Sequence, residues 1–128
     1  MTELKPQVIE IVREVNWPPE RVYAAWTDPA QMQQWLAPVV QSEARVGGRF
    51  RIEGEMEGVG TMIFVGDFQV LEPGRKVRMS WEMEDKSMMP FEAIGEYVEV
   101  TLEPLDGDRT RMTLVNAWTG PEMSEEDA

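Results

Sequence analysis

The fold is decided by residues 46–56, Val46-Gly-Gly-Arg-Phe-Arg-Ile-Glu-Gly-Glu-Met56. From Arg49 onward the side chains alternate, with Phe50 and Ile52 on one parity and arginines and glutamates on the other. A period of two is typical of a β-strand that turns one face to a core and the other to water. The glycine pair at residues 47–48 lacks Cβ atoms, which permits a sharp bend in the strand. The segment therefore predicts a curved antiparallel sheet with one wet face.

The composition is that of one globular domain covering residues 1–128. Its 24 acidic and 12 basic residues give a formal net charge of −12, which repels phosphate backbones and anionic lipid surfaces. We therefore expect neither nucleic acids nor membranes as partners. No apolar run approaches the roughly 20 residues of a membrane-spanning helix. No signal-peptide pattern opens the chain, so we expect a cytoplasmic protein.

The residue counts also restrict the chemistry. The chain contains neither histidine nor cysteine, which removes Ser-His and Cys-His nucleophilic machinery and the usual zinc ligands. Glu53 and Glu55 share a face, but they alternate with Arg49 and Arg51, a pattern typical of an exposed, charge-paired surface. We therefore expect no catalytic residue, no metal site and no cofactor.

Two short helices are predicted after a first strand over residues 8–15. Pro19 suits the first turn of a helix that runs to Trp26. Asp28 and Pro29 supply a cap and a first turn for a second helix, which ends near residue 36. The remainder predicts an antiparallel meander joined by turns rich in glycine, with strands at residues 42–46, 48–57, 60–71, 76–84, 96–104 and 109–118.

Residues 85–95 do not alternate, and we interpret them as a long hairpin loop with apolar residues near its tip. Two interpretations of Met88, Met89 and Phe91 stay open. They fold back on the edge of the sheet, or they form a flexible lip over a cavity, since methionine adapts to irregular surfaces.

The order of several short motifs resembles one known family. Residues 11–29, Ile-Val-Arg-Glu-Val-Asn-Trp-Pro-Pro-Glu-Arg-Val-Tyr-Ala-Ala-Trp-Thr-Asp-Pro, are similar to the opening of the homologues of the activator of heat-shock-protein-90 ATPase. That family lies within the START-like, or SRPBCC, superfamily. The resemblance covers about residues 8–118. Its further matching features are Met32 with Trp35, Val46 to Phe50, Gly66-Asp67-Phe68, Leu71-Glu72-Pro73, Val77 to Trp81, and Thr110 to Leu114.

The resemblance implies an α+β helix-grip fold. In this fold a strongly curved, seven-stranded antiparallel sheet wraps around a long C-terminal helix, and two short helices follow the first strand. The resemblance carries over no catalytic residue.

The inner parity of the meander supports a first hypothesis, the binding of a small hydrophobic ligand between the sheet and the C-terminal helix. Its aromatic and methionine side chains suit an apolar pocket, and Asn116 supplies a polar group. The alternative is that the same side chains only pack against that helix. The candidate ligand-binding residues are Trp35, Phe50, Ile52, Met62, Phe64, Phe68, Met79, Trp81, Met112, Leu114 and Asn116.

Two other functions stay open. A co-chaperone-like or stress-related protein interaction, which the family resemblance implies, would use an exposed apolar patch of Met88, Met89, Phe91 and Trp118. The minor alternative is a cyclase-like enzyme that uses the shape of its pocket rather than a pair of acids. Acid–base catalysis by two carboxylates needs contrasting environments that split their pKa values, and the sequence indicates no such pair.

Residues 124–127, Ser-Glu-Glu-Asp, have the pattern of a helix start, with an N-cap serine followed by acids. Members of the resembling family continue here into the long helix. An inner face as apolar as this one is unstable in water. We therefore expect either that the natural chain continues as that helix, or that a second copy covers the face in a homodimer.

Overall fold

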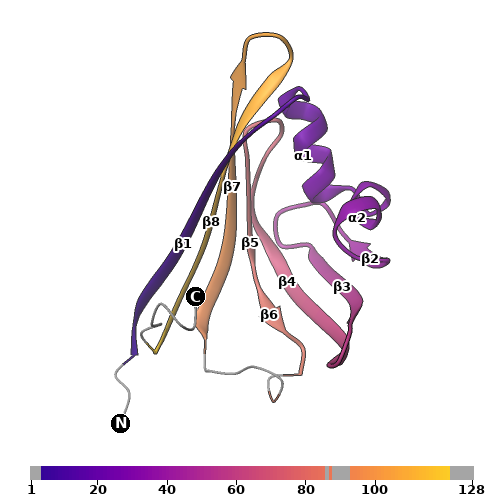
Figure 1. Ribbon diagram of the computed structural model, residues 1–128, viewed down its shortest axis with the longest axis vertical. Helices are drawn as coiled ribbons and strands as arrows, with labels where there is room; N and C mark the ends of the chain where they lie inside the picture. Colours follow the sequence, from indigo (N-terminus) through magenta and orange to yellow (C-terminus); the bar gives the residue numbers. More distant parts are fainter. Residues whose placement is uncertain (1–3, 86, 88–92, 122–128) are drawn as a thin grey trace.

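The computed structural model describes residues 4–85, 87 and 93–121. These residues form two short helices and one sheet of eight antiparallel strands (Figure 1). The strands follow the order β1-β8-β7-β5-β4-β3-β2, and β6 pairs with β4. The elements are β1 (Leu4–Val15), α1 (Pro19–Thr27), α2 (Pro29–Trp35), β2 (Val39–Ser42), β3 (Arg49–Met56), β4 (Gly60–Glu72), β5 (Lys76–Ser80), β6 (Glu82–Met83), β7 (Ile94–Leu105) and β8 (Arg109–Pro121).

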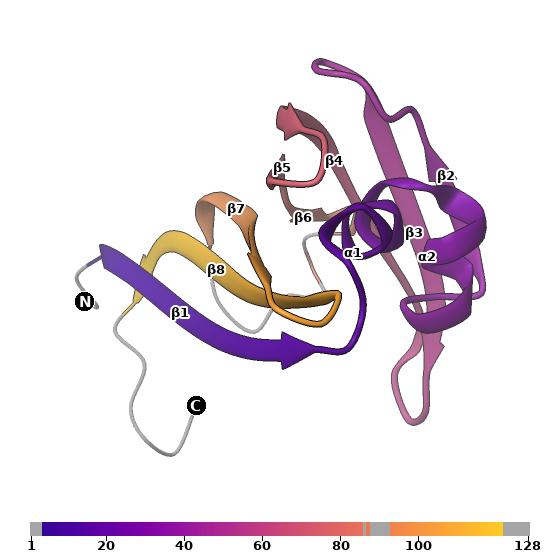
Figure 2. The ribbon, with the colours of Figure 1, turned by 90° about the horizontal axis from the view of Figure 1, so that it is seen from above.

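The sheet is strongly bent, and α1 lies on its hollow side (Figure 2). The strands β1, β8 and β7 make one wing of the bend, and β4, β3 and β2 make the other. Both helices lie on one side of the molecule, beside the upper half of the sheet (Figure 1). The predicted α+β fold, with a curved antiparallel sheet and two helices after the first strand, is confirmed.

The two helices are joined by the cap that the sequence predicts. The Asp28 carboxylate accepts a hydrogen bond from the Ala30 amide at 2.9 Å, and prolines occupy the first turns of both helices. Ser42 on β2 donates its hydroxyl to the Thr27 carbonyl at 2.9 Å, which fixes the end of α1 to the sheet. The end of α1 is therefore held to the β2 wing by one side-chain hydrogen bond.

The core fills the hollow of the sheet. Trp26 of α1 and Met32 of α2 pack in one core with Phe50, Phe68 and other apolar side chains of the inner face of the sheet. The Phe50 ring contacts those of Phe68 and Trp81, each with centroids 5.7 Å apart. The predicted alternation thus places these three rings on one face. The remaining sheet residues of this core include Val40, Ile52, Val77, Met79, Val98, Val100 and Leu102.

We expected the glycine pair at residues 47–48 to bend a strand. In the structure it closes a loop instead. The second strand occupies residues 39–42 rather than 42–46, and it starts directly after the Pro38 that ends the helical region. Gly47 has φ +83°, a left-handed conformation that glycine adopts without strain. Gly47 donates its amide to the Phe68 carbonyl, and the Gly48 carbonyl accepts from the Phe68 amide. The loop is therefore anchored to β4 by its backbone.

Other strand boundaries also differ from the expected ones: β1 begins at Leu4 rather than at residue 8, and β8 runs to Pro121 rather than to residue 118. The predicted strand over residues 76–84 is divided at Trp81 into β5, which pairs with β7, and β6, which pairs with β4. The Trp81 amide still donates to the Glu96 carbonyl on β7. β7 begins at Ile94 rather than at residue 96. The alternation of buried and exposed side chains cannot show where one strand ends and the next begins here, because Met79 in β5 and Met83 in β6 are both buried.

Several expectations fall outside the described residues, or fail within them. Met88, Met89 and Phe91, and the C-terminal residues 122–128, lie outside that part of the chain. Trp118 was expected in an exposed patch, but it is 7% exposed, because it lies on the inner parity of β8. No helix among the described residues is long and apolar enough to span a membrane.

Gly66→Ala is expected to destabilise the domain by about 2 kcal/mol, because a Cβ at this position overpacks the core. The new atom would lie 2.7 Å from two carbons of the Phe50 ring and closer still to the Ser80 carbonyl oxygen. Gly54→Ala is the matched control, since its Cβ would meet only ordinary contacts at 3.7 Å. Urea unfolding followed by tryptophan fluorescence measures both. Equal stability of the two variants would contradict the close packing at Gly66.

Candidate ligand-binding pocket between the helices and the sheet

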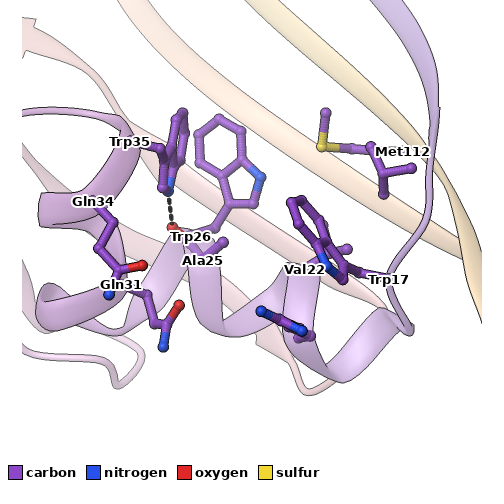
Figure 3. A pocket seen from close by; sticks show the side chains of 10 residues that line it. Trp17, Val22, Ala25, Trp26, Gln31, Gln34, Trp35 and Met112 are labelled. Atoms are coloured by element: carbon purple, nitrogen blue, oxygen red, sulfur yellow. Dashed lines mark hydrogen bonds between the residues drawn. The ribbon is translucent and has the colours of Figure 1, made fainter.

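A pocket of about 450 Å³ lies where the two helices face the end of the β1 and β8 strands (Figure 3). Both helices and both strands contribute side chains to it. The lining residues are Val15, Trp17, Arg21, Val22, Ala25, Trp26, Gln31, Gln34, Trp35 and Met112.

Two indoles form the α1–α2 side of the pocket. Trp26 and Trp35 meet edge to face, with centroids 4.8 Å apart and planes at 71°. The Trp35 indole donates its Nε1–H to the Ala25 carbonyl at 2.7 Å, across the connection between the helices (Figure 3). Trp35 is nonetheless 47% exposed, because its face looks into the pocket and toward solvent. The hydrogen bond therefore orients an indole that the core itself does not cover.

Trp17 forms the opposite side, at the end of β1. Its carbonyl accepts a hydrogen bond at 2.7 Å from the Thr110 hydroxyl, which is completely buried at the start of β8. The Trp17 side chain is 50% exposed. A buried side chain thus fixes the backbone that carries an exposed indole.

The rim of the pocket carries the polar groups. Gln31 and Gln34 project from α2 on the same side (Figure 3), as expected for residues three apart on a helix. The Arg21 guanidinium lies over the Trp17 ring, with its central carbon 5.2 Å from the ring centroid. The pocket therefore combines an apolar interior with amide and guanidinium donors at its mouth.

A second, smaller hollow of about 190 Å³ lies on the β3–β4 side of the sheet. Ile52, Met62, Phe64 and Trp81 line it together with Leu36. The Phe64 and Trp81 rings stack there with centroids 5.2 Å apart. This hollow has less than half the volume of the first pocket, which we call the tryptophan-lined pocket because Trp17, Trp26 and Trp35 line it.

The residues predicted to bind a ligand are therefore distributed over four places. Trp35 and Met112 line the tryptophan-lined pocket. Phe50, Phe68 and Met79 are fully packed in the core, with 2% of their surface exposed or less. The remaining residues are Ile52, Met62, Phe64 and Trp81 in the smaller hollow, and Leu114 and Asn116 further along the concave face of β8.

Asn116 belongs to a polar pair on the concave face. Its Nδ2 donates to the Glu96 carboxylate at 3.0 Å and to the Tyr97 carbonyl at 3.1 Å. Glu96 is half-buried, and this burial raises the pKa of its carboxyl group above the ordinary value, while the Asn116 hydrogen bond opposes the shift. An ionisable group thus sits on a face that is otherwise mostly apolar.

Sequence reasoning missed all residues of the tryptophan-lined pocket except Trp35 and Met112, and it also missed Glu96. The parity of β7 contained a signal for Glu96, because Val98 and Val100 lie on the inner face and Glu96 shares their parity. Trp17 and Arg21 carry no such signal, since the pocket they line forms only when β1 and α1 are folded together. Among the described residues, no group of three or more acidic, histidine or cysteine side chains gathers as a metal site.

The family model described as activator of Hsp90 ATPase homolog 1-like protein matches residues 16–128. The chain belongs to this family. The expected membership of the family is thereby confirmed, and the tryptophan-lined pocket lies almost wholly within the matched range of this AHSA1-like domain, apart from Val15. No curated protein matches the sequence.

Solved structures of the same fold include protein CV1439 from Chromobacterium violaceum, with 29% identity and a TM-score of 0.75 over 93% of this chain and 84% of that one. CalU16 from Micromonospora echinospora has 25% identity and a TM-score of 0.64, over 98% of this chain and 72% of that one. PFC0360w, described as an HSP90 activator from Plasmodium falciparum, has 22% identity and a TM-score of 0.68, over 85% and 71%. This last likeness shows that this AHSA1-like domain and PFC0360w have the same helix-grip fold.

Glu96→Gln is expected to stabilise the domain near neutral pH. A carboxyl whose folded pKa is raised contributes stability below its ordinary value of 4.5, and this stability is lost as the pH rises through the raised pKa. Glutamine stays neutral and still offers Asn116 an oxygen. Urea midpoints of variant and native protein should therefore agree below pH 4.5 and separate above it. Glu57→Gln, in an exposed turn, removes the same charge as a control, and an equal effect there would contradict the expectation.

Proposed function

We propose that this domain binds a small apolar molecule in the tryptophan-lined pocket. The observation that carries the proposal is the pocket itself, because its volume of about 450 Å³ and its three indoles are of the kind that ligand sites use. Ligand sites commonly have apolar walls and a few polar groups that set orientation, and here Gln31 and Gln34 are such groups.

The exposure of two of these indoles supports the same function. Trp17 and Trp35 leave about half of their surface in water, on opposite sides of one hollow. Covering apolar surface is favourable by roughly 25 cal/mol per Å². A flat apolar molecule that enters the pocket would bury both rings together with Met112. The free energy of binding would come mainly from this burial.

Ala25→Leu tests the proposal by filling the pocket. Ala25 lines the hollow from the last turn of α1, and leucine keeps the helix stable while its larger side chain occupies the space. The neutral dye phenylnaphthylamine, which fluoresces in apolar surroundings, is expected to bind native protein and to bind the variant about tenfold more weakly.

Ala30→Leu is the matched control, because Ala30 is exposed in the first turn of α2 and lies outside the pocket lining. It should bind the dye like native protein. Failure of native protein to bind the dye, or equal binding by the Ala25 and Ala30 variants, would contradict a ligand site in this pocket.

A second candidate function is regulation of a protein partner. The structure presents β1 as an edge strand with several exposed apolar side chains, among them Val8 at 67% and Val12 at 46%. An exposed strand edge with apolar side chains is suited to pairing with another chain. Since the chain is AHSA1-like, Hsp90 is the partner to test.

The double variant Val8→Lys/Val12→Lys is expected to abolish most of any increase that native protein causes in the ATPase rate of purified Hsp90. Two charges on an edge strand oppose pairing while leaving the buried face intact. Val59→Lys, in the exposed turn before β4, is the control. A native protein without effect on the rate, or a double variant as active as native, would rule out this edge as the Hsp90 surface.

A further inference from the structure

Arg21 is the charged member of the pocket. Of the described residues that line it, the others are apolar side chains, indoles and two glutamines. Arg21 lies in the first turn of α1, and its guanidinium is stacked over Trp17. The contact with the Trp17 ring restricts the rotamers of Arg21 and holds its planar guanidinium at the mouth of the pocket.

The guanidinium has no carboxylate partner among the described residues. Other arginines do have one: Arg78 pairs with Glu99 at 3.5 Å, and Arg111 pairs with Glu103 at 3.2 Å. Of the described arginines, Arg13 and Arg75 also lack a carboxylate partner, but neither of them lines this pocket. Its five N–H donors match the oxygens of an anion.

The neighbouring side chains define the rest of the ligand. A bare inorganic anion would contact Arg21 but would leave the indoles of Trp26 and Trp35 uncovered. A wholly neutral molecule would cover the indoles but would leave the guanidinium without a partner. An apolar body with one anionic group satisfies both sets of contacts at once.

We infer that the ligand of this pocket is a small apolar molecule with one anionic group, which Arg21 binds while Trp17, Trp26 and Trp35 hold the apolar body. The inference rests on the proposed function of the pocket. A free small molecule is the source we favour over a lipid in an anionic membrane, because the net charge of −12 opposes approach to such a surface.

Two dyes with related aromatic skeletons separate the charge from the apolar body. Anilinonaphthalene sulfonate and phenylnaphthylamine share their ring system, and only the first carries an anion. Arg21→Gln is expected to weaken binding of the sulfonate about tenfold and to change binding of the neutral dye less than about twofold, since one charge-assisted contact is lost. Arg21→Lys should recover part of the sulfonate affinity because it restores the charge.

Arg75→Gln is the matched control, because it removes the same charge from an exposed turn outside the pocket lining. Circular dichroism and urea unfolding establish that each variant is folded, and Arg21→Lys provides the comparison if Arg21→Gln is not. Vesicles of anionic lipid, tested by co-sedimentation, should not retain the native protein.

Each remaining outcome is decisive. If the neutral dye does not bind native protein, the proposed function fails and this inference fails with it. If the neutral dye binds but Arg21→Gln weakens both dyes equally or neither, or if Arg75→Gln weakens the sulfonate as much, the pocket stands and the anionic ligand is refuted. Retention on anionic vesicles would refute a free molecule as the source.

Discussion

The contact on which the sheet depends is that of the Phe50 ring with the bare backbone of Gly66. These residues are opposite each other on β3 and β4, so an aromatic ring covers a position with no side chain of its own. The Ser80 carbonyl approaches the same spot from β5, and the Ser80 hydroxyl accepts the Asp67 amide at 2.8 Å. Just beyond, the register of β4 and β5 shifts between Phe68 and residue 70. Three strands thus converge where one Cβ is missing, and the sheet turns there from one wing to the other.

This bend creates the pocket as a consequence. A flat sheet would meet the helices along one face, whereas a bent sheet holds α1 in its hollow and leaves space between the helices and the β1–β8 wing. The hydrogen bond from Thr110 to Trp17 closes that space at one end, and the bond from Trp35 to Ala25 limits it at the other. The same two bonds hold exposed indoles in fixed positions without burying them. The pocket is therefore a product of the sheet's curvature rather than of a cavity in its core.

The sequence was sufficient for both helices, for most of the strands and for the inner face of the sheet, but not for the pocket. Prolines and Asp28 showed both helices because capping is local, and alternation placed Phe50 and Phe68 correctly because each strand keeps its period. A pocket is not local. Its walls come from segments almost a hundred residues apart, and a parity rule assigns an indole to a face without showing whether a neighbour covers it. Trp35 was among the candidate residues and lines the pocket, whereas Trp17 entered only as part of the family motif over residues 11–29, because nothing near it in the sequence indicates the buried Thr110 that fixes it.

The edge-to-face arrangement of Trp26 and Trp35 also has an optical consequence. Two indoles at 4.8 Å with planes at 71° have electronic transitions that couple, and coupled transitions in a chiral arrangement give a pair of circular dichroism bands of opposite sign. These bands overlap the far-ultraviolet signal of the backbone. For a domain with so little helix and so many strands, they distort any secondary-structure content calculated from the spectrum. The Trp26–Trp35 pair is therefore an intrinsic probe of the connection between α1 and α2. The intensity of its circular dichroism bands depends on the angle between the two helices, so no attached label is needed to follow that angle.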